Sequence, residues 1–168
     1  MEFQELIRRR YSVREYRSDP VSEEALARIL EAGRLAPTAA NRQPFRIVVL
    51  HTAGRREALG RVYRRPWFAQ APLVICVCGV PGEAWVRKDG RSHLDVDAAI
   101  VMDHLVLAAT DEGLGTCWIA NFDMIAAREV FELHENEVPL LLTTLGHAAD
   151  SPGPKERRSL DSLLRRIR

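Results

Sequence analysis

The sequence predicts an α+β or mixed α/β domain in which helices cover one sheet. Segments with apolar residues at helical spacing alternate with short apolar runs that are typical of strands. The connections between these segments vary in length, which favours this class of fold. The length fits one compact domain over residues 1–168, and the 46% of hydrophobic and 28% of charged residues are ordinary for a globular protein.

Helical spacing predicts a first helix over residues 2–9 and a second one that begins after Ser22. Ser22 is a suitable N-cap because its hydroxyl can accept a hydrogen bond from a free backbone N–H. Glu23 and Glu24 suit the positive end of the helix dipole. Pro37 ends this helix, because the residue before a proline avoids the helical conformation.

The rest of the chain alternates between strands and helices. The expected strands are residues 45–50, which we expect to be buried, 73–78, 114–119 and 140–145. The expected helices are residues 54–63, 95–112, 123–131 with Asp123 as cap, and a short amphipathic helix around Leu160, Leu163 and Leu164. Residues 81–94 are polar and contain glycine, so we expect a loop or mobile flap there.

The helix predicted over residues 95–112 carries apolar residues on more than one face. A helix that is apolar nearly all round must be buried on most of its sides. In a domain of this size a subunit interface explains such a helix, so we expect a homodimer. Gly113 stops the helix, since glycine readily adopts the backbone conformation that ends one.

Overall charge excludes several classes of partner. The formal net charge is only +1, so we expect neither nucleic acid nor a membrane surface as a partner. Residues 1–10 are charged and lack the apolar core of a secretion signal, and no apolar run is long enough to span a bilayer. These features, with an odd number of cysteines, favour a cytoplasmic setting. Lys88 and Lys155 are the only lysines, so anion binding must depend mostly on arginine.

Several common kinds of site are missing from the sequence. No Gly-x-Gly-x-x-Gly follows a strand, and there is no phosphate-binding Gly-Lys-Ser/Thr loop and no Gly-x-Ser-x-Gly elbow. Cys76 and Cys78 would share one face of a strand, but no further ligands lie nearby, so we expect buried cysteines. The five histidines lack metal spacing, so we expect each of them, including His104 on the long helix, to be solvated or satisfied within the core. We therefore expect no metal site.

Three other segments contain groups that could bind a ligand. In Arg10–Arg14 two arginines flank a hydroxyl, which suits a phosphate, although a solvated basic helix end would look the same. In Ala36–Phe45 the amides of Asn41 and Gln43 can donate and accept, which suits the edge of a heteroaromatic ring. An ordinary connection between a helix and a strand remains the alternative for this segment.

The third segment, Glu112–Asp123, contains Trp118 near the end of a predicted strand. Its indole offers a flat apolar surface, and the backbone of residues 119–121 could face a ring. A buried core tryptophan is the alternative interpretation of this segment alone.

Together, in this order, the three segments resemble the nitroreductase family of flavoproteins. The matching motifs are Arg9–Arg14, Pro20-Val21 followed by Leu26, Ala36–Phe45, and Gly-Leu-Gly-Thr-Cys-Trp-Ile at Gly113–Ile119. The resemblance extends over nearly the whole chain and is weakest between Thr52 and Asp95. It implies a nitroreductase-like α+β fold, with a central mixed or antiparallel sheet flanked by helices, and a homodimer with a long buried interface helix.

The resemblance also implies that the chain binds FMN. The implied cofactor-binding residues are Arg10, Tyr11, Ser12, Arg14, Pro37, Thr38, Asn41, Gln43, Trp118, Ile119, Ala120, Lys155 and Arg157. The residues near the two chain ends would hold the phosphate and ribityl end, with Arg158 as an alternative to Arg157. The loop that begins at Pro37 would reach the flavin from the partner subunit. Trp118 and its two followers would lie beside the isoalloxazine ring, and Arg14 would stabilise negative charge on the flavin.

Some positions depart from the family pattern. Thr38 replaces a serine but keeps the hydroxyl, and Phe45 replaces a tryptophan. Residues 120 and 121 replace positions that vary between subgroups, so the substrate stays open.

The implied activity is ping-pong hydride transfer from NAD(P)H to an acceptor such as a nitroaromatic or a quinone. Because the flavin carries the chemistry, no side chain is expected to be a nucleophile. Two alternatives remain. One is a specialised reaction of the same family, such as flavin fragmentation or dehalogenation, and the other is a flavin-binding or sensory module without turnover.

Overall fold

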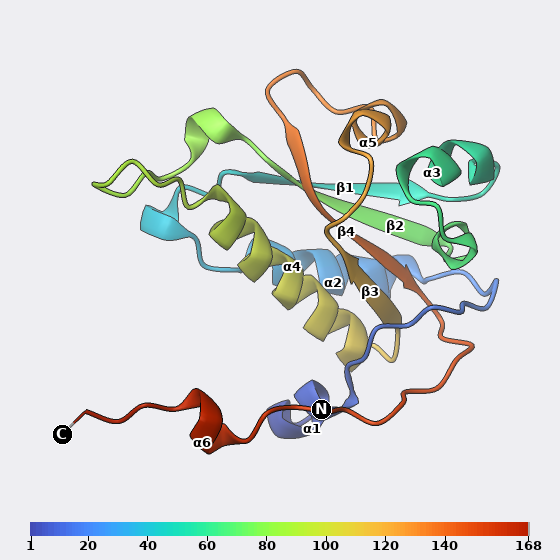
Figure 1. Cartoon of the computed structure of the whole chain (residues 1–168). Helices are drawn as coiled ribbons and strands as arrows, with labels where there is room; N and C mark the ends of the chain where they lie inside the picture. Colours follow the sequence, from blue (N-terminus) through green and yellow to red (C-terminus); the bar gives the residue numbers. More distant parts are fainter. Residues whose placement is uncertain (168) are drawn as a thin grey trace.

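The computed structural model describes residues 1–167 (Figure 1). Four strands form a sheet in the order β1-β2-β4-β3, and every neighbouring pair is antiparallel. The strands are β1 (Phe45–His51), β2 (Leu73–Gly79), β3 (Gly115–Ile119) and β4 (Val138–Gly146). The α-helices are α1 (Phe3–Arg9), α2 (Glu23–Arg34), α3 (Arg56–Val62), α4 (Leu94–Asp111), α5 (Met124–Val130) and α6 (Leu160–Leu163). The predicted α+β class is confirmed, and the sheet is antiparallel.

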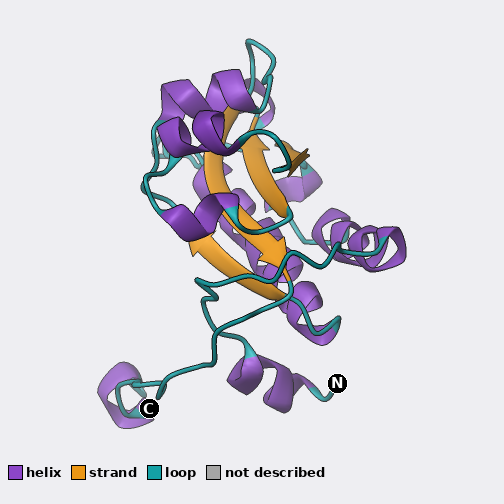
Figure 2. Ribbon diagram, turned by 90° about the vertical axis from the view of Figure 1, so that its right-hand side faces the viewer, coloured by secondary structure: helices purple, strands orange, loops and turns teal. Residues whose placement is uncertain are grey.

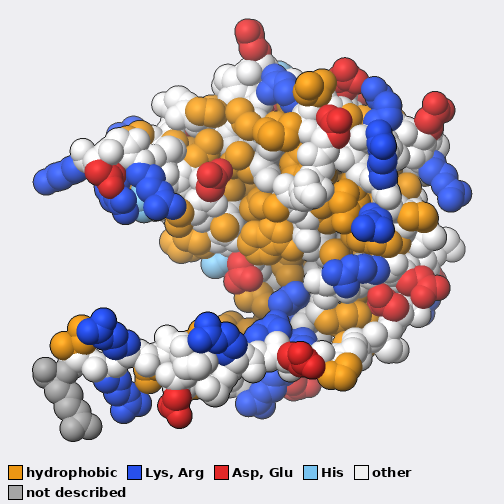
Figure 3. Space-filling view, in the orientation of Figure 1, with side chains coloured by type: hydrophobic (Ala, Val, Ile, Leu, Met, Phe, Trp, Pro, Cys, Tyr) orange, Lys and Arg blue, Asp and Glu red, His pale blue; other side chains and the backbone are white. Residues whose placement is uncertain are grey.

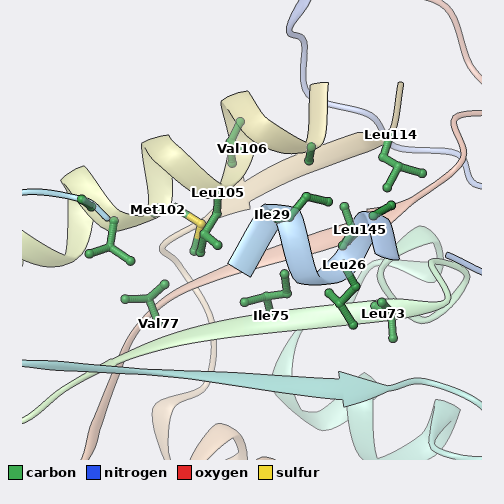
Figure 4. Packing of buried hydrophobic residues seen from close by; sticks show 14 of the residues in the cluster. Leu26, Ile29, Leu73, Ile75, Val77, Met102, Leu105, Val106, Leu114 and Leu145 are labelled. Atoms are coloured by element: carbon green, nitrogen blue, oxygen red, sulfur yellow. The ribbon is translucent and has the colours of Figure 1, made fainter. Parts of the chain in front are cut away.

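Helices cover both faces of the sheet, α2 and α4 on one and α3 and α5 on the other (Figure 2). The alternation of side chains along β2 supplies both cores. Leu73, Ile75 and Val77 pack against α2 and α4, as Figure 4 shows. The alternate residues Val74, Cys76 and Cys78 pack against α3 and α5. Every residue of β2 is therefore buried, which explains its uninterrupted apolar sequence.

The prediction of a buried strand at residues 45–50 is wrong in part. The strand exists as β1, but it lies at an edge of the sheet and pairs only with β2. Most of its residues are half-buried, and Leu50 alone is buried. Arg46 points outward and forms an ion pair with Glu83 at 2.8 Å. A run of apolar residues indicates that the side chains of a strand are apolar. It carries no information on how many neighbouring strands form hydrogen bonds with that strand.

Both predicted N-caps are confirmed. The Ser22 hydroxyl accepts a hydrogen bond from the backbone N–H of Ala25 at 3.2 Å, and the carboxylate of Asp123 accepts one from Ala126 at 2.9 Å. Helix α2 ends at Arg34, three residues before Pro37. Gly113 follows α4 with a φ of +74°, the left-handed conformation that glycine adopts without strain.

The long helix α4 is buried on one side only. Eight of its residues are buried against α2 and the sheet, while Val96 is 43% exposed on the opposite side. Ala99 and Ile100 lie on that side as well, beside Asp95, Asp103 and His104. Within one chain the predicted burial on most sides is thus not reached, and an apolar strip of α4 faces outward.

Cys76 and Cys78 are buried on one face of β2, as predicted, with their sulfurs 3.3 Å apart. Hydrogen bonding between the two thiols and burial raise the pKa of Cys76. The Nδ1 atom of His104 lies 3.0 Å from the carbonyl oxygen of Ile100, within its own helix. Among residues 1–167 no group of three His, Cys, Asp or Glu side chains could hold a metal ion. No helix in this range is long and apolar enough to cross a membrane.

Residues 81–94, predicted as a loop or flap, contain a short 3-10 turn (Pro81–Glu83) and a hairpin. Val86 and Ser92 form a bridge across the hairpin, and the rings of Trp85 and His93 meet edge to face at 4.8 Å. The C-terminal tail is exposed throughout its described part, and the predicted amphipathic helix is the single turn α6. Figure 1 shows this tail running past α1 and away from the sheet.

Two segments from opposite ends of the chain complete the edge of the sheet at β3. The N–H of Val13 donates to the carbonyl of Thr116 at 2.9 Å, so residues 12 and 13 lie alongside β3. Arg17 and the carbonyl of His147 form a second backbone hydrogen bond, also at 2.9 Å. These bonds bring the segment after α1 next to the segment after β4.

The close approach of Val13 to β3 requires a glycine at position 115. A Cβ atom there would lie 2.6 Å from Cγ2 of Val13. We expect Gly115→Ala to lower the free energy of unfolding by about 1–3 kcal/mol, the usual cost of overpacking. Gly60→Ala is the matched control: no atom lies within 4 Å, and Gly60 is inside helix α3, so stability should rise by about 0.5–1 kcal/mol. Urea unfolding of both variants measures these changes, and an equally stable Gly115→Ala protein would contradict the argument.

Candidate functional site

A basic hollow of about 350 Å³ forms where the two ends of the chain meet. It is lined by Arg10, Tyr11, Ser12, Arg14, Gly153, Pro154, Lys155, Glu156 and Arg157. In the sequence these residues form two groups far apart, and the backbone bonds beside β3 bring them together. Figure 3 shows basic side chains gathered where the tail meets the body of the molecule.

The cations of this hollow have no carboxylate partner. Among residues 1–167, none of Arg10, Arg14, Lys155 and Arg157 forms an ion pair. Desolvation, together with the positive charges of Arg10 and Arg157, lowers the pKa of Lys155. Its ammonium donates to the carbonyls of Ile7, at 3.3 Å, and Arg8, at the end of α1. Since like charges raise the energy of this arrangement, a bound anion would stabilise it.

The donors of the hollow suit a phosphate group in particular. Guanidinium groups donate in a planar fork that matches two phosphate oxygens, and an ammonium supplies a compact charge. Arg10 and Arg157 supply the forks, Lys155 the ammonium and Ser12 a hydroxyl. The phosphate chemistry predicted from Arg10–Arg14 alone thus gains two cations from the other end of the chain.

Asp150 holds this hollow together and was not predicted. Its carboxylate accepts hydrogen bonds from the backbone N–H of Arg14 at 2.8 Å and from the Tyr11 hydroxyl at 3.1 Å. Burial, and then this hydrogen bond, raise the pKa of Tyr11. The Tyr11 hydroxyl is therefore already engaged, and Tyr11 lines the hollow with its ring. No local sequence pattern around Asp150 indicates this contact, because its two hydrogen-bond partners lie more than 130 residues away in the sequence.

Strand β3 belongs to the predicted segment Glu112–Asp123, which contains Trp118. The side chain of Trp118 is 38% exposed, whereas Ile119 is 4% exposed and packs into the core with α3 and α5. Ala120 follows the strand and is exposed. The indole of Trp118 and residue Ala120 are therefore the accessible parts. Cys117, also not predicted, is buried close to Ser12 and Arg14; burial raises the pKa of its thiol, and these two neighbours oppose the increase.

The remaining predicted group is the segment 37–43, with the amides of Asn41 and Gln43. It contains a 3-10 turn (Ala39–Asn41). Ala40, Asn41 and Gln43 all have φ values near +50°, in the left-handed region that side chains other than glycine rarely adopt. The Thr38 hydroxyl accepts from the N–H of Gln43 at 3.0 Å, and the Gln43 amide donates to the Asn41 side chain at 3.2 Å. Strained conformations of this kind cluster at ligand-binding segments.

One chain does not bring all three groups together. The hollow lies at the end of α4 that contains Thr110, which lines an adjoining hollow with Arg10. The segment 37–43 lies at the opposite end, where Ala39 contacts Asp97. An α-helix of the 18 residues of α4 is about 27 Å long at 1.5 Å per residue. The amides of the 37–43 segment and the basic hollow of the same chain are therefore far apart.

Comparison with known proteins identifies the family. The sequence profile of the nitroreductase family matches residues 7–64 and 55–147. A crystal structure of a nitroreductase family protein from Clostridium difficile 630 is 34% identical, covers 98% of both chains and superposes with a TM-score of 0.89. A structure from Desulfovibrio desulfuricans, determined in complex with FMN, is 26% identical, covers 99% of this chain and 97% of that one, and has a TM-score of 0.84.

Among curated relatives, a Bacillus subtilis protein named FMN reductase (NAD(P)H) is 27% identical over 166 residues. The match covers 87% of this chain and 66% of that protein. With the profile covering most of the chain and a structural relative above 30% identity, the chain belongs to the nitroreductase family.

Proposed function

We propose that the protein binds FMN and acts as an NAD(P)H-dependent oxidoreductase. The observation that carries this proposal is the basic hollow, whose cations form no ion pair with a carboxylate of residues 1–167, together with the exposed indole of Trp118. A phosphate linked to a flat ring system matches both features. The FMN-bound relative and the relative named FMN reductase support the choice of this cofactor.

Each end of the cofactor has candidate partners in the chain. Arg10, Ser12, Lys155 and Arg157 would hold the phosphate. The indole of Trp118 and the backbone of residues 119 and 120 would lie beside the ring. When bound, FMN supplies the two-electron hydride chemistry, while the protein binds and orients it and adjusts the local charge.

Arg14 is the candidate for stabilising negative charge on the ring. One of its guanidinium nitrogens donates to the carbonyl of Ser12 at 3.3 Å, which fixes the side chain beside the hollow. No carboxylate among residues 1–167 forms an ion pair with it, so its charge remains available. A fixed cation acts more strongly where water is excluded.

We further propose that two chains form a symmetric dimer through the outward face of α4. A hollow of about 460 Å³ on this face is lined mainly by apolar surface of Val96, Ala99 and Ile100. In a two-fold dimer the same patch meets itself. If the two α4 helices cross in opposite directions, the 37–43 segment of one chain lies near the basic hollow of the other. This arrangement would assemble the three predicted groups into one site.

Within this site, an acceptor such as a nitroaromatic or a quinone would replace the oxidised nicotinamide, which gives ping-pong kinetics. Because the flavin would carry the hydride chemistry, the chain's part is to bind the two substrates in turn.

The test is a visible absorption spectrum of the purified protein reconstituted with FMN, followed by anaerobic addition of NADH and NADPH. We expect a bound flavin spectrum that bleaches with at least one of the two and recovers on addition of a quinone or a nitroaromatic. Protein that binds no FMN would refute the proposal. Protein that binds FMN but is reduced by neither nicotinamide would be a flavin-binding module.

Arg10→Ala tests the phosphate site. Loss of one charge-assisted contact should weaken FMN binding by about 1.5–3 kcal/mol, or roughly 10- to 150-fold in Kd. Arg34→Ala is the matched control, because Arg34 pairs with Glu31 at 2.6 Å on α2 and does not line the hollow. Flavin fluorescence titration measures both. Equal Kd values for the Arg10→Ala variant and the unmodified protein would remove Arg10 from the site.

Ile100→Glu tests the dimer. A carboxylate in the centre of the apolar strip would be buried without a partner, so we expect a monomer and a loss of FMN affinity. Ile125→Glu is the control, because Ile125 is 75% exposed on α5, across the sheet from α4. Sedimentation equilibrium with and without FMN gives the mass. A dimer that persists in Ile100→Glu, or unmodified protein that is a monomer with FMN bound, would contradict this interface.

A further inference from the structure

We infer that Asp97 is a positioning residue that holds the 38–43 segment in the conformation in which it contacts FMN. This inference rests on the proposed function, because it assigns the segment a contact with that cofactor. Asp97 lies in the first turn of α4, and its Oδ1 atom accepts a hydrogen bond from the backbone N–H of Ala39 at 2.8 Å.

The environment of Asp97 is unfavourable for a carboxylate. The residue is 1% exposed, and its Oδ2 atom has no hydrogen-bond partner among the described residues. A buried carboxylate with a free oxygen destabilises a fold, and an apolar residue of similar size usually packs better. The N-terminal end of the helix offsets part of this cost through its dipole. An aspartate at this position therefore contributes something other than stability.

The contribution of Asp97 is visible in the hydrogen bonds of the segment. Thr38, Ala39, Asn41 and Gln43 form hydrogen bonds with one another and with their immediate neighbours. Within residues 1–167, the bond to Asp97 is the only hydrogen bond that ties residues 38–43 to a distant part of the fold. The two partners are 58 residues apart in sequence.

The segment needs such an anchor because its backbone is strained. Three of its residues hold a φ near +50°, and each such conformation costs on the order of 1 kcal/mol for a residue with a Cβ atom. Without an anchor the segment would relax to other conformations, and the amides of Asn41 and Gln43 would lose their fixed direction. A ligand would then have to order the segment on binding, which weakens affinity. Asp97 thus orders the segment before a ligand binds, although its buried carboxylate lowers the stability of the fold.

The experiment compares two variants that lack an acceptor, Asp97→Leu and Asp97→Ala, with Asp97→Asn, which keeps an acceptor oxygen. Leucine fills the buried volume and alanine empties it, so the pair separates the loss of the acceptor from a packing defect. Glu57→Gln is the control, because Glu57 is an exposed carboxylate in the first turn of α3, across the sheet from α4. FMN affinity is measured by fluorescence titration, and the melting temperature is measured without FMN.

We expect Asp97→Leu to weaken FMN binding about tenfold or more, the scale of one lost charge-assisted hydrogen bond, while the flavin-free protein melts at the same or a higher temperature. Asp97→Ala should lose FMN affinity to the same extent. Asp97→Asn should stay within about threefold of the unmodified Kd, since the amide oxygen still accepts from Ala39. Glu57→Gln should also stay within about threefold, because Glu57 lies on the other face of the sheet.

Unmodified FMN affinity in a folded Asp97→Leu or Asp97→Ala protein would overturn the inference, as would loss of affinity in Asp97→Asn equal to that in Asp97→Leu. Unfolding of both variants that lack an acceptor would assign Asp97 to stability and overturn it too. Failure of the unmodified protein to bind FMN is a separate result, because it refutes the proposed function. The FMN affinity of the unmodified protein is therefore measured before that of any variant.

Discussion

The burial of α4 is the constraint on which the rest of the structure depends. The helix packs against α2 and against the face of the sheet formed by β2 and β4, and it needs two glycines to come this close. A Cβ at Gly33 would lie 2.7 Å from Leu105, and one at Gly79 would lie 2.8 Å from Leu94. Because α4 is rigid and long, it also fixes the separation between the basic hollow at one of its ends and the strained 38–43 segment at the other. A functional site that uses both ends therefore has to be assembled from two copies of the chain.

Much of the fold could be predicted from the sequence because its elements follow local rules. Periodicity located the helices and strands, and the caps at Ser22 and Asp123 set two helix starts. The order of the strands could not be predicted in this way. The edge position of β1 depends on which strands pair with it, and its apolar sequence resembles that of β2, which has a partner on each side. The single exposed face of α4 likewise depends on packing, since its sequence is apolar nearly all round.

The residues of the candidate site likewise divide into those that the local sequence could predict and those that it could not. Arginines around a hydroxyl, amides between prolines, and a tryptophan at a strand end each have a local chemical meaning, so all three groups could be proposed from the sequence. Asp97 and Asp150 have no such meaning, because each acts on backbone groups at least 58 residues away. Sequence spacing does not report a contact at that distance. What the two residues share is a carboxylate that accepts a hydrogen bond from a backbone N–H far away in the sequence.

The arginine-rich composition has a practical consequence at Lys155. The chain has only two lysines, and one of them is held in the basic hollow with a lowered pKa. At a pH below the pKa of an ordinary lysine, a larger fraction of the Lys155 amine than of an ordinary lysine amine is unprotonated and nucleophilic. Reagents that acylate lysines, including those used to attach proteins to surfaces or dyes, have only two lysine targets in the chain, and one of them lies in the hollow. Attachment chemistry for this protein is better directed at carboxylates or at a tag, so that the hollow stays open to solution.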